Sequence, residues 1–372
     1  MLIAGEPVHS GSFHLSLSLS ASVPIGARGI PIPAVKVDTA RRARHCSAMR
    51  VLVIGGAGYI GSHVTRMLLD ADHTTKVYDN FSSGVEENIF PEAGLVRGDI
   101  LDEPTLNDTM AEGWDAVVHL AALKAAGESM IQPEKYAVNN IAGTINVLNA
   151  MARADVYSIV FSSSAAVYGE PEYLPLDEDH PTSPENFYGF TKLEIERLMR
   201  WYESLRGIRY ASLRYFNAAG YHPEGRVTGL ERNPANLLPV ILEVVVGRRD
   251  ELQIFGDDYP TPDGTCIRDY VHVTDLADAH VKSLEYISAR GESLVANLGS
   301  GRGYSVTEMV NTVRQVTGHP VPTKMVGRRP GDPARLVASS DYAQRLLGWT
   351  PRYSTPTELA RSTWNAYLKA RS

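Results

Sequence analysis

The chain has 372 residues and a formal net charge of −7 at pH 7, and its 36 lysines and arginines are scattered rather than clustered. Without a basic stripe, it is not expected to follow a nucleic-acid backbone. The two cysteines, Cys46 and Cys266, exclude a disulfide framework, and neither stands in the spacing of a metal site. No apolar run reaches the length of about 18 residues that a membrane span needs. We therefore expect a globular protein of the reducing cytoplasm, with no metal and no nucleic-acid or membrane partner.

Residues 1–48 differ from the rest of the chain. They contain a serine-rich stretch from Ser10 to Ser22 and a short basic run at Arg41, Arg42 and Arg44. We interpret them as a disordered extension. Two alternatives remain open: a targeting peptide, although a secretory signal would need a positive segment before the first apolar stretch, and a start of translation upstream of a functional start at Met49.

From Met49 onward, short β-branched runs alternate with longer segments of helical periodicity, as βαβ units with a parallel sheet require. The expected strands are Arg50–Ile54, Lys76–Tyr78, Ala116–Leu120, Ser158–Phe161 and Ala211–Arg214. The expected helices between them are Gly61–Asp70, Asn139–Ala152 and Tyr188–Leu205. This pattern predicts an α/β fold with a doubly wound parallel sheet of the Rossmann type over residues 49–216.

After about Asn217 the rhythm loosens into loops rich in glycine, proline and aspartate. Helical periodicity returns at Leu237–Val246, Val273–Tyr286 and Val306–Thr317. We expect residues 217–372 to form a smaller C-terminal lobe that binds substrate. We leave open that some segments of this lobe return to the first sheet.

A glycine-rich loop directly follows the first expected strand and opens the first expected helix. Gly55, Gly58 and Gly61 lie in this loop, where glycines let the backbone and a helix N-terminus approach a pyrophosphate. Asp79 ends the next strand, where a carboxylate accepts hydrogen bonds from the ribose hydroxyls of an adenosine. Asp79 also favours NAD over NADP, because it would repel a 2′-phosphate. The alternative for Asp79 is a residue that only shapes the turn after the strand.

Tyr188 and Lys192 stand four residues apart, on one face of an expected helix. An ammonium at this spacing is expected to lower the phenol pKa toward neutrality, which makes the tyrosine a usable base. Ser162, Ser163 and Ser164 end a strand at the edge where a doubly wound sheet binds its ligand, so one hydroxyl is placed to bond a reacting oxygen. Taken alone, each motif would also fit a solvated helix surface or a serine-rich strand end.

Together these residues resemble the extended short-chain dehydrogenase/reductase superfamily and, within it, the UDP-glucose 4-epimerases. The resemblance covers nearly everything from Met49 onward. Its further motifs include Gly98-Asp99-Ile100, Ser162–Gly169, Arg214-Tyr215-Phe216-Asn217, Arg268–His272 and Arg329–Asp332. The resemblance implies that Tyr188 takes the C4 hydroxyl proton of a UDP-hexose while the C4 hydride passes to a tightly held NAD, giving a 4-keto sugar that is reduced again on its opposite face.

The resemblance also assigns residues to roles. Ser164, Tyr188 and Lys192 are implied as catalytic, with Lys192 holding the nicotinamide ribose. The implied cofactor-binding set is Gly55, Gly58, Tyr59, Ile60, Gly61, Asp79, Asn80, Phe81, Ser82, Ser83, Gly84, Asp99, Ile100, Leu120, Ala121, Ala122, Lys124, Asn139, Tyr188, Lys192 and Phe216. The implied substrate-binding set is Ser164, Tyr188, Asn217, Asn236, Leu237, Gln253, Phe255, Arg268, Arg329, Asp332 and Leu336.

An arginine is suited to bind a diphosphate because one guanidinium can donate hydrogen bonds to two phosphate oxygens. Arg268 and Arg329 would otherwise be surface ion-pair formers. Leu336 stands where some relatives carry a bulky tyrosine beside the sugar C2 group, so the chain is expected to leave room for UDP-N-acetylglucosamine. Alternatively, Leu336 only packs in the small lobe.

Two departures from the family pattern are Phe187, before the tyrosine, and Leu120, in place of a phenylalanine; neither removes a polar group. A 4,6-dehydratase would need an acidic pair where Ala165 and Ala166 stand. A catalytically dead NAD-binding sensor would commonly lack the tyrosine or the lysine, and this chain has both. By resemblance, we expect a homodimer formed through paired helices.

Overall fold

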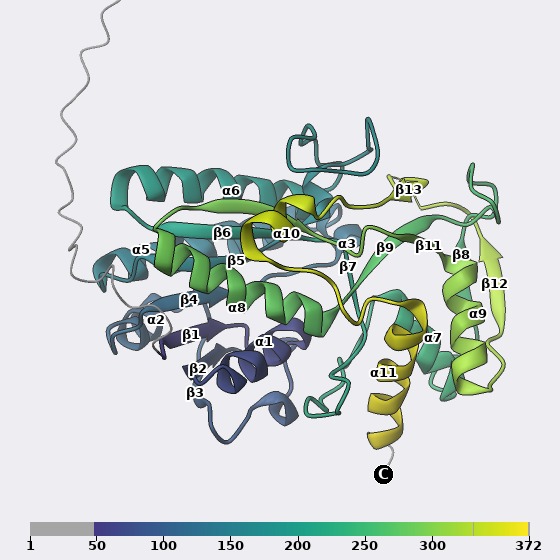
Figure 1. Ribbon diagram of the computed structural model, residues 1–372, viewed down its shortest axis with the longest axis horizontal. Coiled ribbons are helices and arrows are strands. Elements are labelled where there is room, and N and C mark those ends of the chain that lie inside the picture. The colour runs from purple at the N-terminus through teal and green to yellow at the C-terminus, as the bar shows by residue number, and fades with distance from the viewer. Residues whose placement is uncertain (1–47, 330, 371–372) are drawn as a thin grey trace, which may run out of the picture. The chain divides into compact units, whose positions relative to one another are not determined.

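The computed structural model describes residues 48–329 and 331–370 of the chain (Figure 1). The expectation of a disordered extension concerns residues 1–48, which lie outside this part except for Ala48. Among the described residues, no helix is both long and apolar enough to cross a bilayer.

A seven-stranded parallel sheet forms the centre of the larger part of the fold. Its strand order is β10-β6-β5-β4-β1-β2-β3, and every neighbouring pair runs parallel. The order reverses direction between β1 and β4, which is where a doubly wound sheet opens a crevice at the carboxyl ends of its strands. The strands are β1 (Arg50–Ile54), β2 (Thr74–Asp79), β3 (Gly94–Arg97), β4 (Ala116–His119), β5 (Ser158–Ser164), β6 (Arg209–Tyr215) and β10 (Leu294–Leu298).

Helices cover both faces of this sheet (Figure 1). On one face α1 (Tyr59–Asp70) packs against α8 (Val273–Arg290), and a cluster of buried aliphatic side chains fills the space between these helices and the strands. On the other face lie α2 (Glu103–Met110), α5 (Gly143–Arg153) and α6 (Phe187–Arg206), over a second cluster. Strands buried on both faces explain the continuous β-branched runs of the sequence. The predicted doubly wound fold is therefore confirmed.

The helix expected over Asn139–Ala152 is divided in the structure. Residues Ala137–Ala142 form a π-helical turn, η3, which follows α4 (Pro133–Tyr136) and leads directly into α5. A π-turn inserted in a helix frequently marks a functional site. Here it carries Asn139 and Asn140 at the carboxyl end of β4.

Smaller sheets build the second part of the fold. β7 (Asn217–Ala219), β9 (Ile267–His272), β11 (Gly303–Ser305) and β13 (Arg335–Leu336) form one sheet, and β8 (Leu252–Phe255) pairs with β12 (Thr323–Val326). The helices α7 (Leu237–Val245), α9 (Val306–Thr317) and α11 (Pro356–Lys369) pack around a third apolar cluster. These elements supply the side chains expected to bind the sugar nucleotide.

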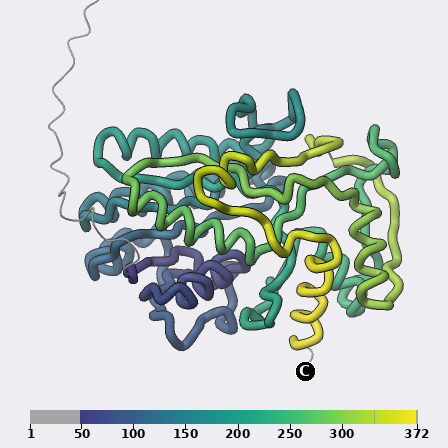
Figure 2. The backbone as a smooth tube through the Cα atoms, viewed as in Figure 1, coloured from purple at the N-terminus to yellow at the C-terminus, as the bar shows by residue number. Residues whose placement is uncertain are grey.

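Part of the C-terminal half belongs to the first sheet. β10 pairs with β6, and α10 (Asp341–Leu347) packs against β10 and α8. In Figure 2 the yellow end of the chain can be followed from β13 to α10 and then back to α11. The division at residues 216 and 217 stays an interpretation of the sequence, because the chain crosses between the two parts several times.

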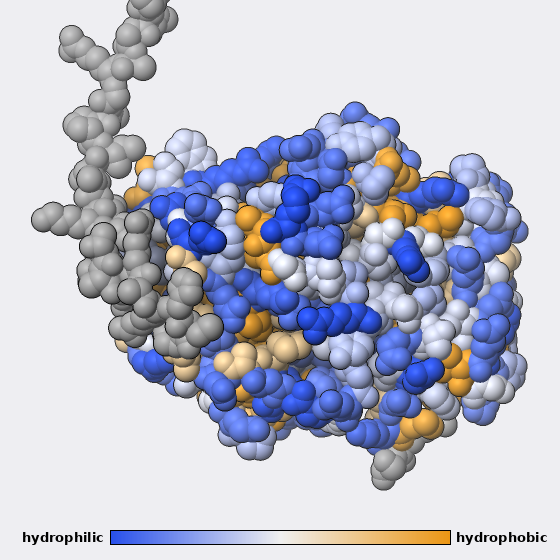
Figure 3. Space-filling model, viewed as in Figure 1, coloured by the Kyte–Doolittle hydropathy of each residue, from blue (hydrophilic) through white to orange (hydrophobic). Residues whose placement is uncertain are grey.

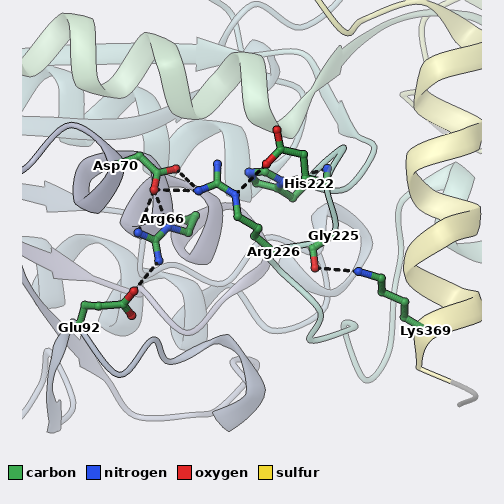
Figure 4. A network of polar contacts seen from close by, with 8 residues as sticks. Arg66, Asp70, Glu92, His222, Gly225, Arg226 and Lys369 are labelled. Carbon is green, nitrogen blue, oxygen red and sulfur yellow. Dashed lines mark hydrogen bonds and ion pairs between the residues drawn. The ribbon is translucent and has the colours of Figure 1, made fainter.

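The segment Gly220–Glu231 joins the two parts through polar contacts (Figure 4). Arg226 forms an ion pair with Asp70 at the end of α1, at 2.7 Å, and Asp70 also pairs with Arg66. Lys369 of α11 donates to the carbonyl oxygen of Gly225. Tyr59, at the start of α1, donates to the carbonyl oxygen of Gly220. The segment therefore ties the glycine-loop helix to the lobe.

Candidate active site

The glycine loop is closely packed, and the packing explains why it needs glycines. Gly55 has a φ of 88°, and a Cβ atom placed on it would stand 2.6 Å from the backbone nitrogen of Ala121. A Cβ on Gly61 would lie 2.1 Å from the carbonyl oxygen of Gly55. No side chain caps the start of α1 at Gly58, so the N–H groups of the first turn are left for a ligand. A helix N-terminus of this kind favours a phosphate.

Asp79 shapes the loop beside this cradle. Its carboxylate accepts hydrogen bonds from the backbone nitrogens of Ala57, at 2.9 Å, and Phe81, at 2.8 Å. Burial raises the pKa of Asp79, while these two bonds lower it. Asp79 thus shapes the turn after β2, which was the alternative interpretation. Each of its oxygens still has a lone pair that can accept a hydrogen bond from a ribose hydroxyl.

The other expected adenosine residues lie around the same crevice. Asn80 donates to Asp99 at 2.8 Å, and the other oxygen of Asp99 accepts from the backbone of Leu101. Ile100 is buried, and its side chain would meet a Cβ placed on Gly143 at 2.5 Å. Ser82, Ser83 and Gly84 continue the loop from Phe81, and a Cβ on Gly84 would be 2.6 Å from the Ala57 side chain.

The carboxyl end of β4 closes the opposite side of the crevice. Leu120 and Ala121 both donate backbone hydrogen bonds to the carbonyl oxygen of Ile54, and Ala122 follows them. Lys124 forms an ion pair with Glu231 of the joining segment. Asn139 donates to Asn140 at 3.0 Å.

Asn140 organises this region, although the sequence reading gave it no role. Its side chain accepts from the backbone nitrogen of Leu123 at 2.9 Å and donates to the carbonyl oxygen of Leu123 and to Thr191 of α6. The end of β4 is therefore fixed to the helix that carries Tyr188 and Lys192.

Ser164, Tyr188 and Lys192 are brought together at the carboxyl end of β5. The Ser164 hydroxyl donates a hydrogen bond to the Tyr188 oxygen. Lys192 Nζ lies 5.7 Å from the centre of the Tyr188 ring and donates to the carbonyl oxygen of Ser162 at 2.6 Å. Helix α6 begins just before this pair because the side chain of Asn186 accepts from Gly189 at its N-cap.

The electrostatics of the pair differ from the expectation. Burial raises the pKa of Tyr188, and the hydrogen bond from Ser164 partly offsets this. Burial also lowers the pKa of Lys192, to about 7, against the attraction of Glu196. Burial of the phenol therefore works against the lowering of the Tyr188 pKa that was expected from Lys192. A lysine with a pKa near 7 carries only part of its charge at neutral pH, and desolvation of the phenol outweighs what remains.

The expected sugar-nucleotide residues gather near the carboxyl end of β6 and the start of β9. Arg268 is 9% exposed and forms an ion pair with Asp332, so it is not a surface ion-pair former. The Arg329 guanidinium lies 3.6 Å from the centre of the Phe255 ring. Leu336 pairs with Arg268 between β13 and β9 and packs against an apolar cluster that includes Phe216.

The remaining expected substrate residues lie on neighbouring elements. Asn217 donates to the carbonyl oxygen of Asp269 at 3.1 Å, and Asn236 donates to that of Ala218 at 3.4 Å. Leu237 begins α7, and Gln253 is exposed on β8, two residues before Phe255. These hydrogen bonds give both asparagines a structural role. Asn217 joins β7 to β9, and Asn236 joins the start of α7 to β7.

The glycine cradle and the uncapped helix start fit a dinucleotide. A side chain at Gly55 would strike the backbone of Ala121, and one at Gly61 would strike the backbone of Gly55, so glycines are needed to bring the loop and the start of α1 close enough for a pyrophosphate to meet their N–H groups. Asp79 at the end of β2 fits the ribose, and the buried Lys192 and Tyr188 fit the nicotinamide end. The residues present therefore match NAD.

The comparisons with known proteins agree with this geometry. Residues 51–299 match the NAD dependent epimerase/dehydratase family. The chain is similar to the UDP-glucose 4-epimerase of Halalkalibacterium halodurans, with 46% identity over 319 residues that cover 85% of this chain and 95% of the relative.

Two solved structures share the fold. The UDP-glucose 4-epimerase from Bifidobacterium longum, in complex with NAD⁺ and UDP, has 39% sequence identity and a TM-score of 0.82, over 87% of this chain and 99% of that one. The UDP-Glc/GlcNAc 4-epimerase from Campylobacter jejuni has 36% identity and a TM-score of 0.76, over 87% of this chain and 100% of that one. The chain belongs to the NAD dependent epimerase/dehydratase family and, within it, to the UDP-glucose 4-epimerases.

Proposed function

We propose that this chain interconverts UDP-glucose and UDP-galactose by transient oxidation at C4. The observation that carries this proposal is the contact of Ser164 with Tyr188 beside Lys192, next to a cradle shaped for a dinucleotide. When bound, NAD takes up the C4 hydride and returns it. The chain's own residues handle the proton and hold the sugar nucleotide.

In this proposal Tyr188 is the base that removes the C4 hydroxyl proton, and Ser164 donates a hydrogen bond at the same oxygen. Lys192 stabilises the phenolate by its charge. Gly55, Gly58 and Gly61, with the first turn of α1, hold the pyrophosphate of the cofactor. Asp79, Asn80 and the loop to Gly84 hold its adenosine, and Asp99, Ile100, Leu120–Ala122, Lys124, Asn139 and Phe216 line the rest of the crevice.

On the substrate side, Arg268 and Arg329 bind the diphosphate of UDP, because a guanidinium suits paired phosphate oxygens. Phe255 and Leu237 contact the uracil end, with Gln253 nearby. Asn217, Asn236, Asp332 and Leu336 complete the pocket around the sugar. Anchoring UDP in this way leaves the 4-keto sugar free to present its other face.

The activity is tested with the purified chain and UDP-galactose, without added NAD, by analysis of the sugars released from the product. We expect UDP-glucose to appear. A protein that binds NAD and forms no epimer would instead be a cofactor-binding sensor.

A 4,6-dehydratase is disfavoured by η4 (Ala165–Val167), the turn that follows Ser164. Ala165 and Ala166 place methyl groups where a dehydratase needs a carboxylic acid. Elimination of water from the sugar therefore lacks its acid.

The preference for NAD gives a testable expectation. Asp79→Asn keeps the side-chain size and one acceptor for the loop but removes the charge that repels a 2′-phosphate. We expect NAD affinity to fall about tenfold, as for the loss of a charge-assisted hydrogen bond, and the preference over NADP to narrow. Reconstitution of the cofactor-free protein with each nucleotide measures both. Equal uptake of NADP and NAD by the unmodified chain would contradict the assignment.

We further propose that the chain accepts UDP-N-acetylglucosamine, because Leu336 is smaller than a tyrosine and lacks its hydroxyl. Pockets discriminate by size with about 1 to 3 kcal/mol per methylene-sized change, so activity on both sugars is expected. Leu336→Tyr should lower activity on the N-acetylated sugar about 10- to 200-fold relative to UDP-glucose. Equal losses on both sugars would mean that Leu336 serves only to pack against Phe216 and its neighbours.

A homodimer is proposed from the surface of α6. Phe190, Trp201 and Leu205 are exposed by 39%, 65% and 53%, and their spacing places them on one side of the helix. The face seen in Figure 3, over α8 and α11, is mainly hydrophilic, with small apolar areas between polar side chains. An apolar stripe on α6 suits pairing with a second copy. A molecular mass measured by light scattering would detect the dimer.

We place the dimer in the cytoplasm, where the two cysteines remain reduced.

A further inference from the structure

A buried ion pair lies behind the Tyr188–Lys192 helix. Arg214 of β6 donates to both carboxylate oxygens of Glu196, at 3.0 and 2.7 Å. The side chains of Glu196 and Arg214 are exposed by only 1% and 4%. Replacing such a pair by apolar side chains is often neutral or stabilising, so stability alone does not account for it.

The pair is connected to the strand end that carries Ser164. Ser163 donates to a Glu196 oxygen at 2.6 Å. The neighbouring carbonyl oxygen of Ser162 accepts from Lys192, and the hydroxyl on the other neighbour, Ser164, bonds to Tyr188. The carboxylate therefore fixes the middle residue of a segment whose two flanking residues contact the proposed catalytic groups.

Glu196 also stands one helical turn after Lys192, on the same face of α6. The other elements around the Lys192 ammonium bring His119 of β4, the Phe161 ring and the Ser162 carbonyl of β5, and Tyr188 of α6. Burial lowers the pKa of His119 to about 3, so it is neutral at working pH. Glu196 is the group whose charge opposes the loss of the Lys192 proton.

We propose that Glu196 is a positioning residue for epimerisation: its carboxylate holds the strand end that carries Ser164 and supplies negative charge that favours the ammonium form of Lys192. The inference rests on the roles proposed for Tyr188 and Lys192. Arg214 and Tyr168 support the carboxylate from behind, because Arg214 also donates to the Tyr168 oxygen at 2.8 Å.

The sign of the expected effect follows from this arrangement. Without the Glu196 charge, Lys192 loses its proton at a lower pH. A neutral amine stabilises the Tyr188 phenolate less, so Tyr188 ionises at a higher pH. In a plot of kcat against pH, the rising limb tracks this ionisation of Tyr188. The limb should therefore move to higher pH.

The test compares Glu196→Gln with Ser163→Ala in the NAD-loaded enzyme, using UDP-galactose. Glu196→Gln removes the charge and keeps an acceptor for Ser163, whereas Ser163→Ala removes the strand hydrogen bond and keeps the charge. We expect Glu196→Gln to move the rising limb up by about 1 pH unit, with little change in KM. The pH at which tyrosinate absorbance appears should move with it. Ser163→Ala should lower kcat and leave the limb in place.

An unmoved limb in folded, active Glu196→Gln would overturn the proposal, and so would an equal shift in Ser163→Ala. If Glu196→Gln alone does not fold, the double variant Glu196→Gln/Arg214→Met removes the unpaired guanidinium as well, and the same upward shift is expected. Failure of the proposed function would look different, because the unmodified chain would then form no epimer at any pH.

Discussion

Replacing Tyr188 by phenylalanine is expected to lower turnover by about 2 to 4 orders of magnitude, the usual contribution of an acid–base group. The variant keeps the ring and its packing at the start of α6 and loses only the oxygen that Ser164 contacts. Because that oxygen acts on the proton in the transition state, KM for UDP-galactose should hardly change. Steady-state kinetics on the folded variant, with the NAD content checked by absorbance, measure both parameters.

Tyr202→Phe is a matched control, because it removes a phenol oxygen from the same helix at a position where that oxygen contacts Asn149 and not Ser164. It should keep the unmodified kcat. Turnover at the unmodified level in Tyr188→Phe, with NAD bound, would contradict the assignment of Tyr188 as the base.

Tyr188 also shows how much of the site could be predicted from the sequence. The spacing of Tyr188 and Lys192 and the position of Ser164 at a strand end are local patterns, and the structure brings these three residues together as expected. Their pKa values depend instead on how deeply the folded chain encloses them. Burial raises the pKa of Tyr188 and lowers that of Lys192 to about 7, and no motif encodes this enclosure.

The polar frame behind the site was missed for a related reason. Glu196 and Arg214 are 18 residues apart, on a helix and a strand, and their contact arises only when α6 packs on the sheet. One signal was available in the sequence and was not used: Glu196 follows Lys192 by four residues, a spacing that places its carboxylate on the same helix face. Asn140 gave no comparable signal, because its partners Leu123 and Thr191 lie on two other segments.

For the fold, the interior strands were predicted because β1, β4, β5 and β6 are buried runs of β-branched and apolar residues. β3 was missed because it is an edge strand whose residues are mostly exposed and show no clear alternation. The sequence left open that a C-terminal segment returns to the sheet, but which segment does so could not be predicted, since the pairing of β10 with β6 joins Leu294 to Ala211 across β7, α7, β8, β9 and α8. Such non-local pairing leaves no periodic trace in either segment.

Gly61→Ala is expected to weaken NAD binding by about 5- to 150-fold and so to reduce the NAD content of the purified protein. The added Cβ would stand 2.1 Å from the carbonyl oxygen of Gly55 and 2.8 Å from the Cα atom of Gly56. Both neighbours are backbone atoms of the cradle, so the loop must move away from the start of α1. Overpacking of this kind costs about 1–3 kcal/mol, which corresponds to a factor of about 5 to 150 in an equilibrium constant.

Gly327→Ala is the matched control, because a Cβ at Gly327 meets nothing within 4 Å. It should keep the full complement of NAD. The nucleotide is released by denaturing each protein and quantified by absorbance, while circular dichroism checks that the variants remain folded. Adding excess NAD should restore part of the activity of Gly61→Ala, because the displaced cradle lowers affinity and leaves Tyr188 and Lys192 unchanged. A folded Gly61→Ala variant that retains as much NAD as Gly327→Ala would show that the glycine loop does not hold the cofactor.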